Sequence, residues 1–592
     1  GREDDLAHLE SALANGSAVI TGMPGIGKSA LLQTIASARV VTMDASMDAQ
    51  SLVAVWLQMD DAPIDLEAQI ELLSQVSEPL VADEVQDVHP RHQQGVHALL
   101  NQLIESESTI AIGMRAPCPF DNPITLAGIN AEAGHKLLGS TVDSQTAADV
   151  CAALDGHPLA LHLWSPSDDL PEASDAVQAF VEETVLSRLA EEARDSLDAL
   201  SAEPRPVLAT HLDSIEIDAL DDAALLRWPN GRVEVQHLIR NVRRVAWQDS
   251  VVIHKQAAQR WSQIDDPEAR WFEAYHRTLA GQDPTDFIVE HQSSILIESA
   301  AAATLLTDAL NALPGAHQLR KMAASLALER GELEIAEDYL NALPELDHTL
   351  LARLYRSQGN LSAAEDAESK AQAMAPKAQA AQMKLSRIAA LIDDRLPHES
   401  GDLGTVEKRL SKINIGDLED DKKRSAIVLV AILRHRIAML KGDQKSAESV
   451  RNDLIQLADG NDPLIDRLSH VEALHLSDPD GPKRLEAEAA MRRLVGRTND
   501  TIQRVSLGLA LVQAQARSNP PGAATTLENL QALLLPLHQA SGRRLDALLW
   551  FWRGQLDSTH RLAYWRESII RFRRAECPRA ARSLTALLHK EL

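Results

Sequence analysis

The stretch from Gly22 to Ser29 contains residues whose types and spacing suit phosphate chemistry. It reads Gly-Met-Pro-Gly-Ile-Gly-Lys-Ser and fits the spacing G-x-x-x-x-G-K-[ST]. Its glycines permit a backbone that points successive N–H groups at an anion, at the positive end of the following helix. Lys28 would reach the β- and γ-phosphates of a nucleotide, and the Ser29 hydroxyl would be a ligand to Mg²⁺. The residues that we expect to bind the nucleotide here are Gly22, Pro24, Gly25, Ile26, Gly27, Lys28, Ser29 and Ala30.

Two carboxylates follow an apolar run at residues 79–82 and suit the hydrolytic part of the same chemistry. Asp83 would hold the Mg²⁺ ion, directly or through water, together with Ser29. Glu84 would orient or deprotonate the attacking water. A solvated turn after a strand is the alternative interpretation of an Asp-Glu pair, but the phosphate loop upstream favours the catalytic one.

Arg115 directly follows the apolar run at residues 109–114 and is the third candidate catalytic residue. An arginine at the carboxyl end of a strand in an open α/β sheet faces the ligand crevice. We therefore predict that Arg115 senses the γ-phosphate, with a surface salt bridge as the alternative.

A parallel α/β sheet is needed to bring these residues together. Residues 29–37 and 64–76 have the apolar spacing of helices, as expected between parallel strands. Because the carboxyl ends of parallel strands meet on one side of a sheet, the loop, the carboxylates and Arg115 should share one crevice. Apolar runs typical of buried parallel strands lie at residues 17–21, 40–43, 79–82, 109–114 and 124–126.

Composition limits the remaining function classes. A chain of 592 residues must form several domains, and its few aromatic residues favour helix over further sheet. The formal net charge of -28 argues against binding of nucleic acid or an anionic membrane by the chain as a whole. No apolar run approaches the length of a membrane span. Cys118, Cys151 and Cys577 fit no metal-ligand pattern and suit a reducing compartment, so we expect a cytoplasmic protein.

Together these residues resemble the STAND class of P-loop NTPases, which are signal-transduction ATPases related to plant resistance proteins, apoptosome-forming factors and bacterial maltose-type regulators. The resemblance rests on Gly1-Arg2-Glu3, the phosphate loop, the strand end at Asp83-Glu84 and the strand that ends at Arg115. It also rests on Gly156-His-Pro-Leu-Ala-Leu161, which is similar to the G-x-P-L-A-L signature of that class.

The resemblance implies roles for several residues. In this class the Gly-Arg-Glu segment lies near the adenine, the proline of the signature packs on the nucleotide, and the strand-end arginine senses the γ-phosphate. These roles fall on Arg2, Pro158 and Arg115. A later histidine that touches the β-phosphate of ADP and helps to hold the closed state corresponds to His237. The chain lacks the Met-His-Asp sequence of the plant and apoptotic branches, and a histidine at a helix start satisfied by backbone is the alternative.

The resemblance also implies a winged-helix domain. Residues 224–228 and 232–236 flank Pro229-Asn230-Gly231, and Asn-Gly between apolar runs is a strong signal for a hairpin. Arginines follow on the next helix and could contact DNA. In so acidic a chain we favour a solvated or interdomain face instead. These arginines are Arg240, Arg243 and Arg244.

The second half of the chain reads as amphipathic helices separated by short breaks. Turns at Gly331, Gly359 and Gly442 share one layout of helix, glycine turn, polar pair and second helix, which resembles tetratricopeptide-like hairpins. Such hairpins stack into an α-solenoid with a concave surface. Near the end, seven arginines between Arg561 and Arg582 alternate with aromatic residues, and we favour a capping helix pair over contact with nucleic acid. The loops expected between stacked units lie at residues 394–404, 477–482 and 518–522.

The predicted fold class is multidomain, α/β followed by α. The expected cofactors are ATP or ADP with Mg²⁺. The predicted domains are a P-loop NTPase domain over residues 1–128, a small helical lid over 129–173, a winged-helix domain over 174–262 and a TPR-like α-helical repeat domain over 263–592.

The predicted function is a molecular switch with slow ATP hydrolysis. ADP would hold a closed form, a protein or small-molecule ligand on the repeats would favour opening, and ATP exchange would permit assembly into a homo-oligomer. An AAA-type ATPase that acts on DNA through its winged helix is one alternative, and a nucleotide-binding solenoid scaffold without turnover is another. Because this class carries its output in an additional terminal domain and the chain starts at Gly1 without Met, we expect an N-terminal portion before it.

Overall fold

The strand before the phosphate loop lies inside a five-stranded parallel sheet. In the computed structural model, the strands are β1 (Ser17–Thr21), β2 (Arg39–Thr42), β3 (Leu80–Asp83), β4 (Ile110–Met114) and β5 (Ile124–Thr125). Their order in the sheet is β2-β3-β4-β1-β5, and the pairs are parallel. Thr21 is level with Met114 in the pairing of β1 with β4, so the phosphate loop and Arg115 leave the sheet as neighbours. The end of β3 emerges on the other side of β4, which brings Asp83 and Glu84 to the same edge.

The chain forms two units that differ in their architecture. The first consists of Gly1–Ala62 and Leu72–Leu319, and the second of Pro63–Glu71 and Arg320–Leu592. Residues 263–319, which the predicted repeat domain includes, therefore belong to the first unit. The expected end of the lid, at residue 173, lies outside the described residues. The structure describes residues 1–106, 108–168, 177–397, 399–418, 420–457, 463–478 and 481–592.

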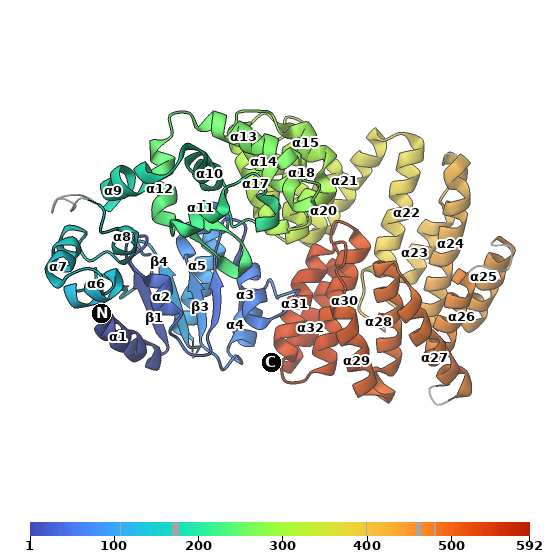
Figure 1. Cartoon of the computed structure of the whole chain (residues 1–592). Coiled ribbons are helices and arrows are strands. Elements are labelled where there is room, and N and C mark those ends of the chain that lie inside the picture. The colour runs from blue at the N-terminus through green and yellow to red at the C-terminus, as the bar shows by residue number, and fades with distance from the viewer. Residues whose placement is uncertain (107, 169–176, 398, 419, 458–462, 479–480) are drawn as a thin grey trace. The chain divides into compact units, whose positions relative to one another are not determined.

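Helices pack around the sheet of the first unit (Figure 1). The phosphate-loop helix α2 (Lys28–Leu32) is shorter than the predicted helix, and the chain continues in turns up to β2. Its Leu31 and Leu32 join Ile20 of β1 in one buried apolar cluster. The other helices beside the sheet are α1 (Glu3–Ala14), α3 (Ala49–Leu57) and α5 (Pro90–Glu105).

Three short helices form the predicted lid segment. The first two are α6 (Ala131–Leu138) and α7 (Ser144–Ala153), and Asn130 and Asp143 cap their first turns. α8 (Pro158–Leu163) starts with the proline of the signature at its first position. Residues 169–176, after α8, lie outside the described residues.

A small antiparallel hairpin follows two further helices. The helices are α10 (Glu191–Ser201) and α11 (Ile217–Asp222), and the hairpin pairs β6 (Leu226–Arg227) with β7 (Glu234–Val235). A bridge between Val207 and Val233 adds a third short segment. The predicted hairpin is present, and its tip is the predicted Asn-Gly turn: Asn230 and Gly231 have left-handed φ values of 53° and 76°, and the Arg232 N–H donates to the Pro229 carbonyl at 3.0 Å. The next helix, α12 (His237–Ala246), starts at the predicted histidine.

Further helices complete the first unit. Trp261 of α13 (Ser250–Ser262) stacks on Phe272 of α14 (Pro267–Leu279), with ring centroids 4.2 Å apart. α17 (Ser299–Ala312) is joined to the start of α5 by a contact of 3.1 Å between His92 Nε2 and the Ala300 carbonyl. Two shorter helices, α15 (Thr285–Glu290) and α16 (Gln292–Ile295), connect α14 to α17.

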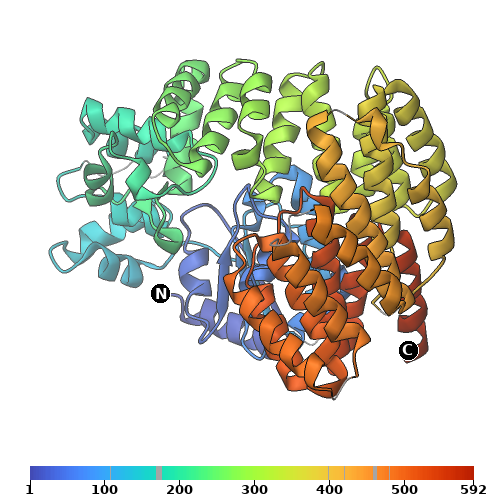
Figure 2. The same cartoon turned by 90° about the vertical axis from the view of Figure 1, so that its right-hand side faces the viewer.

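The second unit is built from helical hairpins with the predicted glycine turns (Figure 2). Gly331, Gly359 and Gly442 have left-handed φ values of 80°, 81° and 68°, and each separates the two helices of one hairpin. These hairpins are α18 (His317–Arg330) with α19 (Leu333–Asn341), α20 (His348–Ser357) with α21 (Leu361–Met374), and α24 (Asp420–Lys441) with α25 (Gln444–Leu457). The remaining helices are α22 (Lys377–Asp393), α23 (Leu403–Ser411), α26 (Pro463–Leu476), α27 (Pro482–Arg497), α28 (Thr501–Ser518), α29 (Pro520–Gln531), α30 (Ala540–Leu556), α31 (Arg561–Arg574) and α32 (Pro578–Glu591).

One loop prediction in this unit is corrected by the structure. Residues 518–522 do not form a loop, because α28 ends at Ser518 and Pro520 already starts α29. Prolines are tolerated in the first turn of a helix, where their missing N–H has no partner to lose. The other two predicted loops contain residues 398 and 479–480, which lie outside the described residues.

The arginines near the end of the chain make contacts within the second unit. Arg571 is fully buried and pairs with Asp546 and Glu567, while Arg574 donates to the Glu329 carbonyl. These contacts fit the capping interpretation of the segment. Within the described ranges, every helix is too short or too polar to cross a membrane.

Candidate functional site

The phosphate loop has the backbone that its glycines predict. Gly25 has a φ of 79°, and Gly27, with a φ of 103°, is the residue before α2. A Cβ atom on Gly25 would lie 2.8 Å from the His157 ring and 2.9 Å from Leu159, so this position has room for glycine alone. The loop thus presents its N–H groups at a helix start, where an anion is favoured.

Lys28 is buried inside this loop. Its Nζ atom donates to the carbonyls of Gly22 and Met23 at 3.1 Å and 3.0 Å. Burial lowers the pKa of Lys28 below its usual value, although Glu84 and Asp83 act in the opposite direction. The ammonium group is therefore held where phosphates bound by the loop would lie.

Ser29 and Asp83, the two predicted oxygen ligands of Mg²⁺, lie within hydrogen-bond distance of each other. The Ser29 hydroxyl is hydrogen-bonded to the buried Asp83 carboxylate, which also accepts the Glu84 N–H at 2.9 Å. Gly113 of β4 makes room for this carboxylate, since a Cβ atom there would lie 2.4 Å from Asp83 Oδ1. Burial and the neighbouring Glu84 raise the pKa of Asp83 to about 6. Hydroxyl and carboxylate oxygens of this kind suit Mg²⁺, whose charge would favour the ionised form of Asp83.

Glu84 is the most constrained residue of the site. Its φ of 55° is left-handed, and its side chain is only 6% exposed. Its carboxylate lies 3.2 Å from His237 Nδ1, 3.4 Å from Arg227 Nη1 and 3.7 Å from Arg115 Nη2. Burial acts to raise the pKa of Glu84, but the hydrogen bond and charge of His237, together with Arg227, hold it far below its usual value. The candidate base is therefore ionised and enclosed by cations.

His237 connects the two carboxylates that follow β3. Its Nδ1 atom faces Glu84, and its Nε2 atom lies 3.3 Å from Asp87. Each ring nitrogen also lies close to a guanidinium nitrogen, of Arg115 or Arg227. His237 therefore lies between two carboxylates and two guanidinium groups.

The same cluster has the spacing of a metal site. Ligand atoms of Glu84, Asp87 and His237 lie within 4.8 Å of one another. Their lone pairs, however, face Arg115 and Arg227, which would repel a cation. We therefore assign the cluster to an ion-pair network and leave the metal to Ser29 and Asp83.

Arg115 lies at the crevice, as predicted, and is also engaged in ion pairs. Its Nη2 atom lies 3.2 Å from Asp87 Oδ1, and its backbone N–H donates to Gln86 Oε1 at 2.8 Å. The ion pair of the alternative interpretation is thus present, and the role as γ-phosphate sensor stays a prediction. To contact a γ-phosphate, the Arg115 guanidinium would have to leave the Asp87 carboxylate.

Arg2 and the signature segment lie at the other side of the phosphate loop. Arg2 donates to the carbonyls of Ile26 (2.5 Å) and Ala127 (2.7 Å) and pairs with Asp5 at 2.8 Å. His157, just before Pro158, contacts the Pro24 carbonyl at 2.9 Å through Nε2. The contact of this segment with the phosphate loop is thus made by His157, the residue next to Pro158. Ala30 is exposed on α2.

Several residues of the site were not predicted. His157 is part of the Gly156–Leu161 signature but was not assigned a role. Gln86 and Asp87 follow Glu84 within one turn, so their closeness in sequence to the candidate base could have indicated them. Gly113 interrupts an apolar strand, which is a signal for close approach of another group. Arg227 carries no such signal, because its place depends on the packing of the hairpin.

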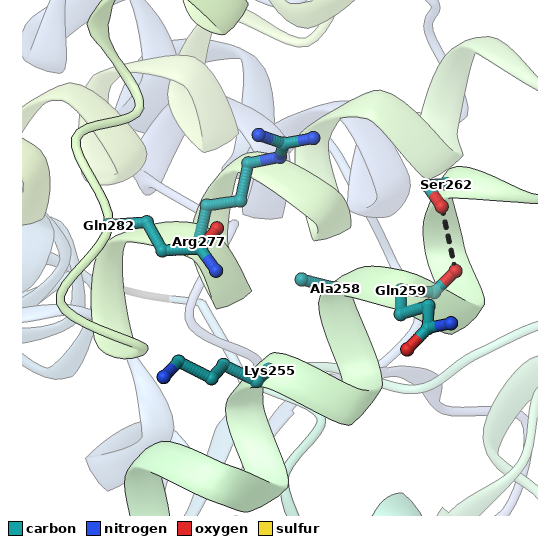
Figure 3. Close-up of a pocket in the computed structure, with 6 residues that line it drawn as sticks. All are labelled: Lys255, Ala258, Gln259, Ser262, Arg277 and Gln282. Atoms are coloured by element: carbon teal, nitrogen blue, oxygen red, sulfur yellow. Dashed lines mark hydrogen bonds between the residues drawn. The ribbon is translucent and has the colours of Figure 1, made fainter.

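A smaller hollow of about 350 Å³ lies between α13 and α14. Lys255 and Arg277 are its cationic residues, and Figure 3 shows their charged ends pointing in different directions. Arg277 is also paired with Glu273 at 2.7 Å and lies over the Phe287 ring. Because the polar groups do not converge, this hollow is a poor candidate for a ligand site.

The fold that carries the site is similar to that of a solved STAND protein. A solved structure described as the Signal Transduction ATPase with Numerous Domains (STAND) protein with a tetratricopeptide repeat sensor, from Pyrococcus horikoshii, is similar to the whole chain. The TM-score is 0.53 and the identity 18%, with 100% of this chain and 97% of that chain covered. No family model and no curated protein matches the sequence. At this identity the likeness establishes the fold, and the activity has to be argued from the site.

Proposed function

We propose that this chain is an ATP-binding and slowly hydrolysing switch of the STAND type. One observation carries the proposal: Glu84, the candidate base, is enclosed by His237 and Arg227 from the hairpin and α12. A carboxylate engaged in this way cannot accept a proton from water. The geometry therefore fits a resting, closed state in which hydrolysis is suppressed.

The residues around the loop fit a nucleoside diphosphate or triphosphate. Backbone N–H groups of the loop and Lys28 would bind the phosphates, and Arg2 and Pro158 would border the base. Mg²⁺, when bound to Ser29 and Asp83, would neutralise charge that develops on the phosphate oxygens. Glu84 would receive the proton of the attacking water once its ion pairs are broken.

Opening of the closed state would act on several residues at once. A displacement of α12 and the hairpin removes His237 and Arg227 from Glu84, and it also frees Arg115 from contact with His237. Slow turnover follows, because hydrolysis waits for this displacement. A protein or small-molecule ligand on the repeats would shift the equilibrium only by binding one state better than the other. Assembly into a homo-oligomer would be a property of the open state.

Two substitutions in the phosphate site test the proposal. Lys28→Ala should abolish binding of ATP and ADP, because the loop loses its only side-chain cation for the phosphates. Glu84→Gln should retain binding and reduce hydrolysis at least about a hundredfold, the usual range for loss of a general base. Binding is measured with a fluorescent nucleotide and hydrolysis by phosphate release.

The two variants control for each other, since each affects one step. Normal hydrolysis by Glu84→Gln would show that another group is the base. A chain that binds no nucleotide at millimolar Mg²⁺, with Lys28 and Glu84 intact, would favour the scaffold alternative.

A DNA-dependent ATPase is the second candidate, and specific contacts weigh against it. Arg243 forms two hydrogen bonds with Asp198, at 2.8 Å and 2.7 Å, and Arg240 pairs with Glu234 at 2.8 Å. α11, the helix before the hairpin, carries Asp218, Asp221 and Asp222. Acidic residues on the helix that would enter a DNA groove oppose binding. ATPase activity that rises with duplex DNA and falls with salt would reverse this conclusion.

A further inference from the structure

A second cavity of about 640 Å³ lies in the first unit beside the candidate nucleotide site. Its described lining comes from the end of β2 and the following turn, the residues after Glu84, the turn between β6 and β7, α12 and α14. The phosphate loop is not part of this lining. The volume falls within the range of small-molecule sites, about 300–1,000 Å³.

Most charges that line this cavity are neutralised by neighbours within the first unit. Arg240 pairs with Glu234, and Arg232 pairs with Glu268 at 2.8 Å. Asp87 pairs with Arg115. These side chains therefore form the walls and leave little charge for a ligand.

Asp44 is the anionic exception. Its Oδ1 atom accepts two hydrogen bonds from Ser46, from the backbone N–H at 2.7 Å and from the hydroxyl at 2.6 Å. Among the described residues, neither a hydrogen bond nor an ion pair engages Oδ2. Burial raises the pKa of Asp44, as expected for a carboxyl group without a paired cation. A ligand ammonium group would supply the missing charge.

Arg244 and Tyr275 provide the complementary groups. Arg244 donates to the carbonyls of Ser201 (2.7 Å) and Glu203 (3.2 Å), and it has no carboxylate partner in the described part of the chain. Tyr275 stacks on Trp271, with centroids 5.6 Å apart, and its hydroxyl has no partner among the described residues. Burial raises the pKa of Tyr275 to about 12, so this hydroxyl remains a proton donor. An anionic group would be held by both side chains.

We propose that this cavity binds a zwitterionic small molecule, with its ammonium group at Asp44 and its carboxylate at Arg244 and Tyr275. The charges of ligand and cavity then cancel in pairs. The apolar walls from the valines and methionines at the end of β2 would contact the carbon skeleton between the two charged groups.

The cavity is connected to the candidate base through one turn. Gln86 and Asp87 line the cavity, and Gln86 also donates to Glu84 and accepts the Arg115 N–H. A bound ligand would therefore act on the position of Glu84 and Arg115. This consequence, unlike the binding itself, rests on the proposed function.

The test uses the full chain and the series alanine, dialanine and trialanine. Each added residue moves the two terminal charges apart by about 3.5 Å, so the series covers the separations that fit the cavity. We expect saturable binding of at least one member by calorimetry. N-acetylation or C-terminal amidation of that peptide should lower its affinity at least about tenfold, because each modification removes one charge-assisted contact. The absence of saturable binding up to about 10 mM, or equal affinity of capped and uncapped peptides, overturns the proposal.

Variants of the cavity residues show which terminus of the peptide binds where. Asp44→Asn should lower the affinity for the uncapped peptide at least about tenfold and leave the affinity for the N-acetylated peptide unchanged. Tyr275→Phe should lower the affinity for the uncapped peptide but not for the amidated one. Lys255→Ala, in the smaller hollow, is the control with unchanged affinity. Lys28→Ala should also retain peptide binding while losing nucleotide, which separates failure of this inference from failure of the proposed function. Loss of peptide binding in Lys28→Ala would mean that the two sites are one.

Discussion

At the scale of single residues, Glu84 combines a left-handed backbone with a buried charge. Both features are unfavourable by themselves, and the ion pairs with His237 and Arg227 offset them. His237→Ala should therefore loosen the closed state and raise basal ATP hydrolysis about threefold to tenfold, corresponding to about 1 kcal/mol of lost interaction. Phosphate release measures hydrolysis, and dissociation of a fluorescent ADP analogue measures retention of the nucleotide.

The matched control is His8→Ala, which removes an exposed histidine from α1 and should change neither rate. Light scattering adds an independent readout, since the loosened variant should assemble at lower ATP concentration. If His237→Ala retains ADP as long as the unmodified chain and stays monomeric, His237 does not hold the closed state.

Residues whose role depends on local spacing could be predicted from the sequence. Lys28 and Ser29 follow β1 through the phosphate loop, and Asp83 and Glu84 lie at the end of β3, so the parallel strands bring all four to one edge of the sheet. Arg227 could not be predicted, because nothing in its neighbourhood distinguishes it from a solvated arginine. Its position is set by the docking of a two-residue strand.

At the scale of elements, apolar runs identify the strands but not their order. The five strands lie within about two residues of the predicted ranges, since buried parallel strands are continuously apolar. Helix α5 was not singled out, because polar residues and four histidine or glutamine side chains fill its first turns. The hairpin was predicted from Asn230-Gly231, and both residues have the left-handed φ that this dipeptide favours in a two-residue turn.

The packing of α13 on α14 contains a buried chain of titratable groups. His254 Nδ1 and His276 Nδ1 lie 2.9 Å apart, and His276 Nε2 lies 3.0 Å from Glu203. Burial, with a smaller effect of His276, lowers the pKa of His254 to about 4. The unfolded state therefore takes up a proton first on acidification. His254 contributes stability that is fully present above about pH 6.5 and lost as the pH falls towards 4.

The pH dependence of thermal unfolding tests this assignment. We expect His254→Asn, which keeps a hydrogen-bonding amide near the Nδ1 position, to lose about 1–3 kcal/mol less stability between pH 7 and pH 4 than the unmodified chain. His589→Asn changes an exposed histidine at the end of α32 and serves as the control. If the stability of His254→Asn and that of the unmodified chain change with pH in parallel, the His254 ring has an ordinary pKa in the folded protein.

At the scale of the whole molecule, the repeats could be predicted as hairpins, but their long-range closure could not. Gly331, Gly359 and Gly442 mark turns between helices that are neighbours in sequence. Glu576, by contrast, pairs with Arg353 and Arg356, more than 200 residues earlier. Which distant residues form such ion pairs depends on the number of hairpins between them and on how these hairpins stack. No single segment of a degenerate repeat contains this information.

The most distant of these contacts concerns the segment Pro63–Glu71, which is part of the second unit although it lies between β2 and β3 in the chain. The fully buried carboxylate of Glu567 in α31 accepts the N–H groups of Ile64 and Asp65, at 2.7 Å and 2.9 Å. Arg566, next to it, pairs with Glu67 and Glu71 at 3.3 Å and 3.1 Å. Backbone hydrogen bonds therefore hold the segment to α31. The chain then continues into β3, the strand that ends at Asp83.

Breaking this attachment should loosen the segment and, through the covalent link to β3, the nucleotide site. Glu567→Ala leaves the partly buried N–H groups of Ile64 and Asp65 without their acceptor and removes one of the two carboxylates that pair with the buried Arg571, a loss of about 3–5 kcal/mol. Hydrogen exchange of the Ile64 and Asp65 amides should accelerate at least about a hundredfold, and dissociation of the ADP analogue should become faster. Arg566→Ala removes only partly exposed pairs, worth about 1 kcal/mol or less, and should leave both rates nearly unchanged. Faster amide exchange with unaltered ADP dissociation would show that the attachment holds the segment without controlling the nucleotide.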